Sequence, residues 1–288
     1  MKNLPEHQKG IIAIVIAAIL WSTGGIFVKL TTLSPMQISF FRCFFAAFVF
    51  LIVFKKELFK ANFFTFVNAG FYAAVLILYV IATKTTTAAN AVFLQYTAPI
   101  YVLIFEPLIN KTKYEKINIL TIAVCFIGMI LFFTGKLSSG NLYGNIIALL
   151  SGVAFAAFLL GMRKNKKEHQ FVSIFYGNIL VVLISVYSIF ELNSISVSNL
   201  LMVSYLGIFQ IGAAYIVFAY GLKRVLAVEA SLISMIEPVL NPVWVLIGYG
   251  EVPSIMASVG GIIILLTVSI RAIIQQSAVM KARFKNYL

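Results

Sequence analysis

The sequence predicts an all-α membrane protein with ten transmembrane helices, arranged as two inverted five-helix repeats around a central cavity. Three observations lead to this prediction. The chain of 288 residues is 61% hydrophobic and only 11% charged, whereas soluble domains keep roughly a quarter of their residues charged. Its apolar residues fall into runs long enough to cross ~30 Å of hydrocarbon as helices. Prolines and polar residues interrupt these runs at matching places in the two halves.

Ten apolar runs predict the spans in order. Membrane β-strands would alternate polar and apolar residues, and these runs do not, so helices are expected. The first run follows a basic N-terminus as a secretory signal would, but it is too long and lacks a suitable cleavage site. The expected helices are 11–32, 36–54, 63–82, 88–109, 117–135, 142–162, 171–191, 200–221, 228–249 and 254–275.

The net charge of +13 follows from topology rather than from a nucleic-acid partner. When the ten spans are threaded, all but four of the 22 lysines and arginines fall on one side. The exceptions are Arg42, inside a span, and Lys29, Lys84 and Lys136 on the other side. Because cytoplasmic loops collect Lys and Arg, we expect both termini in the cytoplasm of a multi-pass inner or plasma membrane protein.

The two halves show weak internal similarity. Residues 9–29 align with 143–163, and Pro99 falls on Pro238. The polar stretch 135–141 separates the halves, which predicts one repeat over 1–136 and a second over 141–288. Each half has five spans, so the second must enter the membrane from the opposite side. Such repeats are typical of transporters, whose sites lie near the midplane on interrupted helices.

Three prolines predict the interruptions. Pro99 lies inside the fourth expected helix, and Pro238 and Pro242 lie inside the ninth. Each removes a helical hydrogen bond and frees a carbonyl. Irregular backbone at membrane depth is tolerated only where protein buries it or where it lines a cavity. We therefore expect hinges at these prolines and a binding site beside them.

Polar side chains accompany the prolines. On the fourth helix, Gln95 and Glu106 share one face with the proline, and on the ninth Ser234, Glu237 and Asn241 follow i, i+3, i+7 spacing. A buried carboxylate is a functional-site hypothesis by default. Glu237 has a structural alternative, in which it only hydrogen-bonds backbone groups at the kink. Glu106, near its helix end, is either a second proton or cation site or a carboxylate at the interface.

Other polar residues lie on further helices. Tyr79 on the third helix either packs or contacts substrate. Gln210, at the centre of the eighth, either bonds a neighbouring helix or binds a ligand. Lys29 is expected to extend to the outer surface, with a substrate role as the alternative.

The stretches 88–104, 227–254 and "ILWSTGGIFVK" in the first helix resemble EamA-type permeases of the drug/metabolite transporter superfamily. The resemblance implies alternating access around a cavity lined by the first, third and fourth helices of each half. With Asn241 added from the spacing, the substrate-binding candidates are Trp21, Tyr79, Gln95, Tyr96, Gln210, Ser234, Glu237 and Asn241.

The predicted function is secondary transport of small organic metabolites, with amino acids or related zwitterionic or cationic compounds as the favoured substrates. Nucleosides, S-adenosylmethionine and lipid-linked substrates are alternatives, and an intramembrane enzyme or a sensor is a weaker one. The chain has no phosphate-binding loop, no aspartate and no buried His/Cys cluster, so no ATPase activity, other enzymatic chemistry, metal or cofactor is expected. Transport direction, proton coupling and oligomeric state stay open.

Overall fold

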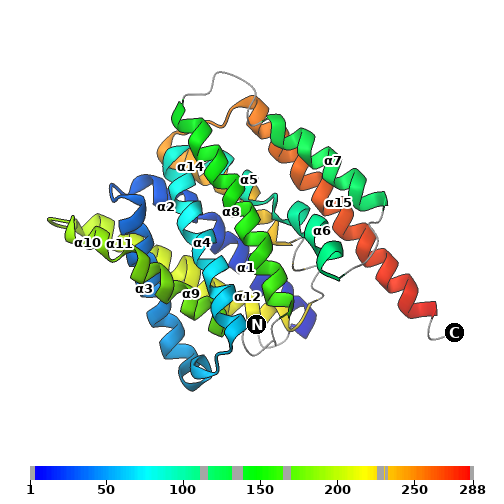
Figure 1. The fold of residues 1–288 in the computed structure, drawn as a ribbon, viewed down its shortest axis with the longest axis horizontal. Coiled ribbons are helices and arrows are strands. Elements are labelled where there is room, and N and C mark those ends of the chain that lie inside the picture. The colour runs from blue at the N-terminus through cyan, green and yellow to red at the C-terminus, as the bar shows by residue number, and fades with distance from the viewer. Residues whose placement is uncertain are drawn as a thin grey trace.

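A computed structural model describes residues 4–110, 116–131, 139–164, 170–225, 230 and 233–285. Every regular element in these ranges is helical (Figure 1). The elements are α1 (Glu6–Ser22), α2 (Gly24–Leu30), α3 (Pro35–Phe54), η1 (Lys55–Phe59), α4 (Phe63–Thr85), α5 (Ala88–Gln95), α6 (Ala98–Asn110), α7 (Lys116–Leu131), α8 (Ser139–Lys164), α9 (Gln170–Ser185), α10 (Tyr187–Phe190), α11 (Val197–Tyr205), η3 (Leu206–Ala213), α12 (Ala214–Leu222), α14 (Ile236–Tyr249) and α15 (Ile255–Lys285).

The helices confirm the predicted class of an all-helical, membrane-spanning protein. Within the described ranges, six helical segments are long and apolar enough to cross a membrane, and three further apolar helices are shorter. The six are Glu6–Leu30, Pro35–Phe54, Phe63–Thr85, Ala88–Leu108, Leu142–Met162 and Val197–Leu222; the three are Lys116–Leu131, Phe171–Ser185 and Ile255–Arg271. The ten-helix inverted repeat remains a prediction. Its expected boundary lies partly in 132–138, which includes Lys136 and falls outside the described residues.

Polar residues define several helix ends. Ser34 and Gln37 form a reciprocal capping box before α3, with Pro35 at the first helical position. Asn62 and Thr65 form a second box before α4. The C-terminal end of α14 lies at Gly250, whose φ of 76° falls in the left-handed region that favours glycine.

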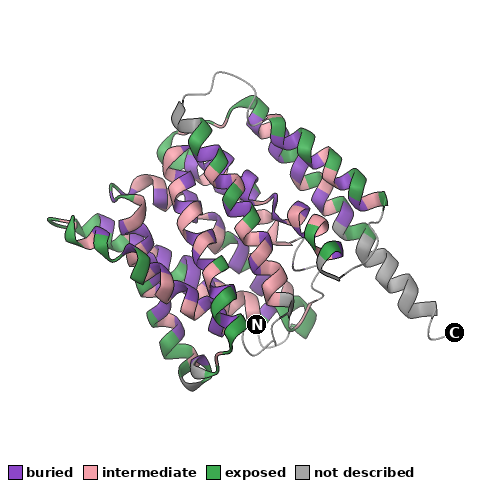
Figure 2. Cartoon of the chain, viewed as in Figure 1, coloured by how far each residue is buried: buried purple, intermediate pink, exposed green. Residues whose placement is uncertain are grey.

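The helices pack around a polar centre. α4 packs against α8 and α9, α3 against α9 and η3, and α1 against α12. α7 and α15 lie side by side along one edge of the molecule (Figure 1). Buried residues concentrate between helices, while the outer faces of the bundle expose large apolar side chains (Figure 2). Such exposure suits a hydrocarbon environment.

Contacts at the two ends of the bundle show which helix ends meet. At one end, Glu6 at the start of α1 pairs with Arg224 just after α12, Nε to Oε2 2.8 Å. At the opposite end, Lys84 near the end of α4 donates to the Thr31 carbonyl after α2, at 2.5 Å. Segments far apart in the chain therefore end at common levels, as expected of helices that cross one layer.

Each of three helices is interrupted at a single residue. Thr23 separates α1 from α2 with φ −75° and ψ −9°, and Tyr96 ends α5 with φ −72° and ψ 7°. Met235 precedes α14 with φ −64° and ψ −9°. All three fall near the sparsely populated bridge region where active-site residues often lie. The interruptions at Tyr96 and Met235 both come three residues before a proline, Pro99 and Pro238.

Three details differ from the sequence-based expectation. The first expected helix breaks at Thr23, where no proline predicted it, and the seventh divides into α9 and α10 around Val186. Conversely, α14 continues through Pro242, which lies inside the helix. Pro238, the third residue of α14, removes no helical hydrogen bond, because the first four N–H groups have no helical acceptor. Pro242, the seventh, lacks one bond to the Pro238 carbonyl, and the helix continues through it.

The inverted topology can be tested by cysteine labelling. The loops after the second and seventh expected helices contain exposed Lys60 and Ser194. We expect Lys60→Cys to react with a membrane-impermeant maleimide only from the cytoplasmic side, and Ser194→Cys only from outside. The native Cys43 and Cys125 are buried and provide the unlabelled background. Labelling of both positions from one side would contradict the inversion.

Candidate functional site

The three helix interruptions come together in the bundle. α2 packs against α14 and α5, and α14 packs against α5. Two glycines at the start of α2 permit this approach. A Cβ on Gly24 would lie 2.9 Å from Nε2 of Gln210, and one on Gly25 would collide with the amide of Asn241. The first interruption is therefore positioned by glycine against residues of η3 and α14.

A carboxylate and a phenol join two of the interruptions. Tyr96 Oη donates to Glu237 Oε2 at 2.6 Å. Tyr96 ends α5, and Glu237 lies in the first turn of α14. Because unpaired N–H groups at a helix N-terminus favour negative charge, the start of α14 is a favourable place for this carboxylate. The bond uses one carboxylate oxygen, so the second can accept from another donor.

One turn along α14, a second bond links the same helix to α4. Asn241 Nδ2 donates to Tyr79 Oη at 3.1 Å, and Asn241 is fully buried. Trp244 Nε1 donates to Ser22 Oγ at 2.9 Å. One face of α14 thus carries polar contacts to α5, α4 and α1 in succession, while Val239 on its other face is exposed.

A buried arginine completes the polar centre, and the site prediction did not include it. Arg42 of α3 is 2% exposed, and its Nη2 donates to Gln210 Oε1 at 3.4 Å. Gln210 Nε2 in turn donates to the Trp21 carbonyl at 3.4 Å. Gln210 lies in η3, a π-helix, and such widened turns are frequent at functional sites. The sequence signal was present: an arginine inside the apolar stretch "FFRCFF".

Aromatic rings enclose this centre. The Trp21 ring packs against Tyr215 and Phe218, with centroids 5.1 and 5.0 Å apart. Tyr79 and Tyr215 lie within electrostatic reach of both Glu237 and Arg42. The two charged groups therefore share a pair of neighbouring tyrosines, but they do not form an ion pair with each other.

The structure does not bring every predicted site residue to this centre. Gln95 Nε2 donates to Ser151 Oγ of α8 at 2.7 Å, and Gly152 of α8 lies against the Gln95 carbonyl. Gln95 thereby anchors the interrupted helix to α8. Ser234 Oγ donates to the Ala230 carbonyl on its own chain segment at 2.8 Å. The substrate-binding roles of Gln95 and Ser234 stay predictions.

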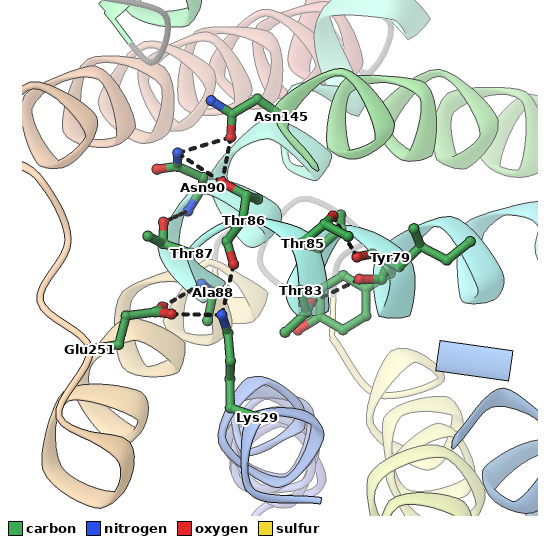
Figure 3. A network of polar contacts seen from close by, with 12 residues as sticks. Lys29, Tyr79, Thr83, Thr85, Thr86, Thr87, Ala88, Asn90, Asn145 and Glu251 are labelled. Carbon is green, nitrogen blue, oxygen red and sulfur yellow. Dashed lines mark hydrogen bonds and ion pairs between the residues drawn. The ribbon is translucent and has the colours of Figure 1, made fainter. Parts of the chain in front are cut away.

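A second polar network closes the end of the bundle that holds the ends of α2 and α4 (Figure 3). Lys29 Nζ pairs with Glu251 Oε2 at 2.6 Å and donates to the Thr86 carbonyl at 2.7 Å. The Ala88 N–H donates to Glu251 Oε1 at 2.6 Å. The Lys29 side chain is only 10% exposed, so the expectation that it extends to the surface was wrong, because an acidic partner lies beside it.

Neutral bonds extend this network across further helices. Thr86 Oγ1 donates to Asn145 Oδ1 of α8 at 2.8 Å, and Asn90 Nδ2 donates to the same oxygen at 2.9 Å (Figure 3). On the other flank, Thr31 Oγ1 donates to Asn199 Oδ1 of α11 at 2.8 Å. Helix ends from both halves of the chain are thus joined by hydrogen bonds at this end of the bundle.

Among the described residues no group of three His, Cys, Asp or Glu could hold a metal ion. Buried polar atoms usually have partners. In the described chain, Trp21 Nε1, Asn241 Oδ1 and two nitrogens of Arg42 have none. Four of the nine such atoms among the described residues thus belong to the polar centre, where they offer three donors and one acceptor to a polar ligand.

Comparisons with known proteins agree with a membrane transporter. The profile of the EamA-like transporter family matches residues 8–134 and 142–271. An uncharacterized transporter of Archaeoglobus fulgidus is 26% identical over 263 residues, which cover 90% of this chain and 94% of that protein. One from Clostridium kluyveri is 27% identical over 284 residues, with 90% and 91% covered.

A human relative and a crystal structure extend the comparison. Human solute carrier family 35 member G1 is 25% identical over 301 residues, which cover 96% of this chain and 81% of that protein. One crystal structure superposes with a TM-score of 0.64 at 16% identity, covering 94% of this chain and 99% of the other. At that identity the likeness shows a shared fold.

The packing at Gly25 gives a stability prediction. In Gly25→Ala the added methyl would displace Asn241 and break its bond to Tyr79, so we expect a loss of about 1–3 kcal/mol, seen as a lower midpoint of thermal unfolding in detergent. Gly70→Ala on α4 is the matched control, because a Cβ there meets nothing within 4 Å. Equal midpoints for the two variants would argue against this contact.

Proposed function

The chain belongs to the EamA-like transporter family, and from this premise we propose that it moves amino acids or related zwitterionic or cationic metabolites across the cytoplasmic membrane by alternating access. The observation that carries the proposal is the meeting of three interrupted helices at Glu237, Tyr96, Tyr79 and Asn241. Interrupted helices around a polar centre are the usual construction of transporter sites.

Glu237 is the proposed central functional carboxylate. A charged acid at mid-membrane costs roughly 2.5–3.5 kcal/mol on translocon-type scales, so it needs a partner. Tyr96 supplies one donor. A substrate ammonium group or a proton would supply the second, and exchange between them would couple transport to protons. The three single-residue interruptions are the proposed hinges, since each can absorb a backbone rotation while the helices on either side of it stay intact.

The network around Lys29 and Glu251 is the proposed outer gate. It joins α2, the start of α5 and the loop before α15, all of which must separate for the centre to open on that side. Cytoplasmic termini and an outer position for this gate follow from the predicted topology. Opening then requires breaking one ion pair and several hydrogen bonds, each individually weak.

A lipid-linked substrate is the second candidate, for one reason. An apolar cleft of about 370 Å³, lined by Met235, Ile236, Val239 and Leu240, lies on the face of α14 opposite Asn241. A cleft beside an interrupted helix could admit an acyl chain while its polar head reached the centre. Scrambling of a fluorescent phospholipid by reconstituted protein would favour this candidate, whereas flux of water-soluble amino acids without scrambling would favour the first.

Glu237→Gln tests the central carboxylate. We expect normal expression and folding, but at least a tenfold loss of amino-acid flux in proteoliposomes or a changed pH dependence, because the neutral amide can neither pair with ammonium nor release a proton. Glu191→Gln, at an exposed loop position, is the matched control. If flux and its pH profile stayed normal in Glu237→Gln, the carboxylate would have only a structural role, and Tyr79, Gln95 and Gln210 would become the better candidates.

The gate is tested by the accessibility of a buried reporter. Thr83 lies on α4 between Tyr79 and the network, and it is fully buried. In a Thr83→Cys background, Lys29→Gln should raise labelling from outside about fivefold, as roughly 1 kcal/mol of pairing is lost. Glu6→Gln, which breaks the pair at the opposite end, should not. Unchanged labelling in Lys29→Gln would mean that the ion pair does not hold the gate closed.

A further inference from the structure

Arg42 combines deep burial with too few partners. It lies in the middle of α3 and is 2% exposed. Its one hydrogen bond to the described chain is long, 3.4 Å, and goes to the neutral amide of Gln210. Nε and Nη1 are buried and have no partner among the described residues. Guanidinium groups stay protonated in proteins, so this charge persists.

An uncompensated buried charge opposes folding. Removing an ion from water costs several kcal/mol even after relaxation, and only a well-placed counter-charge and full hydrogen bonding offset it. The carboxylate of Glu237 does not serve, because it bonds Tyr96 and forms no ion pair with Arg42. A buried guanidinium without a protein counter-charge therefore points to an anionic ligand that binds Arg42 reversibly.

The neighbours of Arg42 place its charge at the candidate site. Gln210, its hydrogen-bond partner, also contacts Gly24 at the first helix interruption. Tyr79 and Tyr215 lie within reach of both Arg42 and Glu237. A positive and a negative group therefore both lie near the same two phenols and near the first helix interruption. Two opposite charges that lie in one polar centre without pairing suit a small molecule that carries both charges.

We propose that Arg42 binds the carboxylate of a zwitterionic substrate, while Glu237 receives its ammonium group. The proposal rests on the proposed transport function and narrows its substrate class to small molecules with both a carboxylate and an amine, such as free α-amino acids. A guanidinium can donate two parallel bonds to a carboxylate, which gives both strength and orientation. Gln210 then acts as a positioning residue, since its amide holds Nη2.

The test compares free amino acids with their carboxamides on the purified full-length chain. Each L-amino acid and its matched amide is screened for thermal stabilisation, because ligand binding raises the unfolding midpoint. We expect at least one amino acid to stabilise the wild type and its amide to do so much less. In Arg42→Gln the affinity for that acid should fall roughly 10- to 100-fold, the effect of losing a charged hydrogen-bond pair, with little change for the amide.

The melting temperature of the ligand-free protein is the control that distinguishes substrate binding by Arg42 from a structural role. Because the unpaired charge opposes folding, ligand-free Arg42→Gln should melt at the same temperature as the wild type or higher. Arg271→Gln is the matched variant: Arg271 is also buried, but its Nε donates to Asn118 at 2.6 Å, between α15 and α7. It should lose thermal stability and keep ligand affinity. Arg42→Lys keeps the charge without the planar fork and should bind with intermediate affinity.

The outcomes separate this proposal from the transport function. Equal binding of acid and amide, or unchanged affinity in Arg42→Gln, overturns the role of Arg42 even if amino-acid flux is normal. A lower melting temperature of ligand-free Arg42→Gln with unchanged affinity assigns Arg42 to the fold. If no amino acid stabilises the wild type, the zwitterion class is overturned. Flux of a cationic amine or a nucleoside in proteoliposomes then decides whether the chain is still a transporter.

Discussion

Hydrocarbon offers no hydrogen-bond partners, so each polar group inside this bundle must be satisfied by protein or by an enclosed polar site. That constraint explains where the irregular backbone lies. The interruptions at Thr23, Tyr96 and Met235 are not scattered along the helices but face one another. The helices that carry them pack against one another, so the irregular backbone lies in the same part of the bundle as Glu237 and Asn241 instead of at several separate sites.

Much of the fold was predictable because hydropathy and proline act locally. Span lengths follow from apolar runs, and two of the three interruptions come three residues before the prolines that predicted them. The break at Thr23 was missed because glycine, rather than proline, permits it. The shared face expected for Gln95 and Glu106 assumed one continuous helix, whereas Gln95 is the last residue of α5 and Glu106 lies in α6.

The site was predictable only in part because its contacts join distant segments. Spacing along α14 correctly put Glu237 and Asn241 on one polar face, since i and i+4 positions lie together on any helix. No pattern of neighbouring residues, however, predicts that Lys29 pairs with Glu251 or that Arg42 lies beside Gln210. A buried cation inside an apolar run is a sequence signal that justifies a site hypothesis before its partner is known.

The π-helix of the eighth span has a consequence for the energetics of transport. η3 at Leu206–Ala213 widens one helix of the second half, whereas α4 in the first half is a continuous α-helix from Phe63 to Thr85. In the proposed alternating-access cycle, two halves that differ in backbone would not exchange conformations as equivalent units. The inward- and outward-facing states of that cycle would then have unequal free energies, and the two directions of interconversion would have unequal rates. Such a kinetic asymmetry would originate in helix geometry, before any substrate or ion gradient acts on the protein.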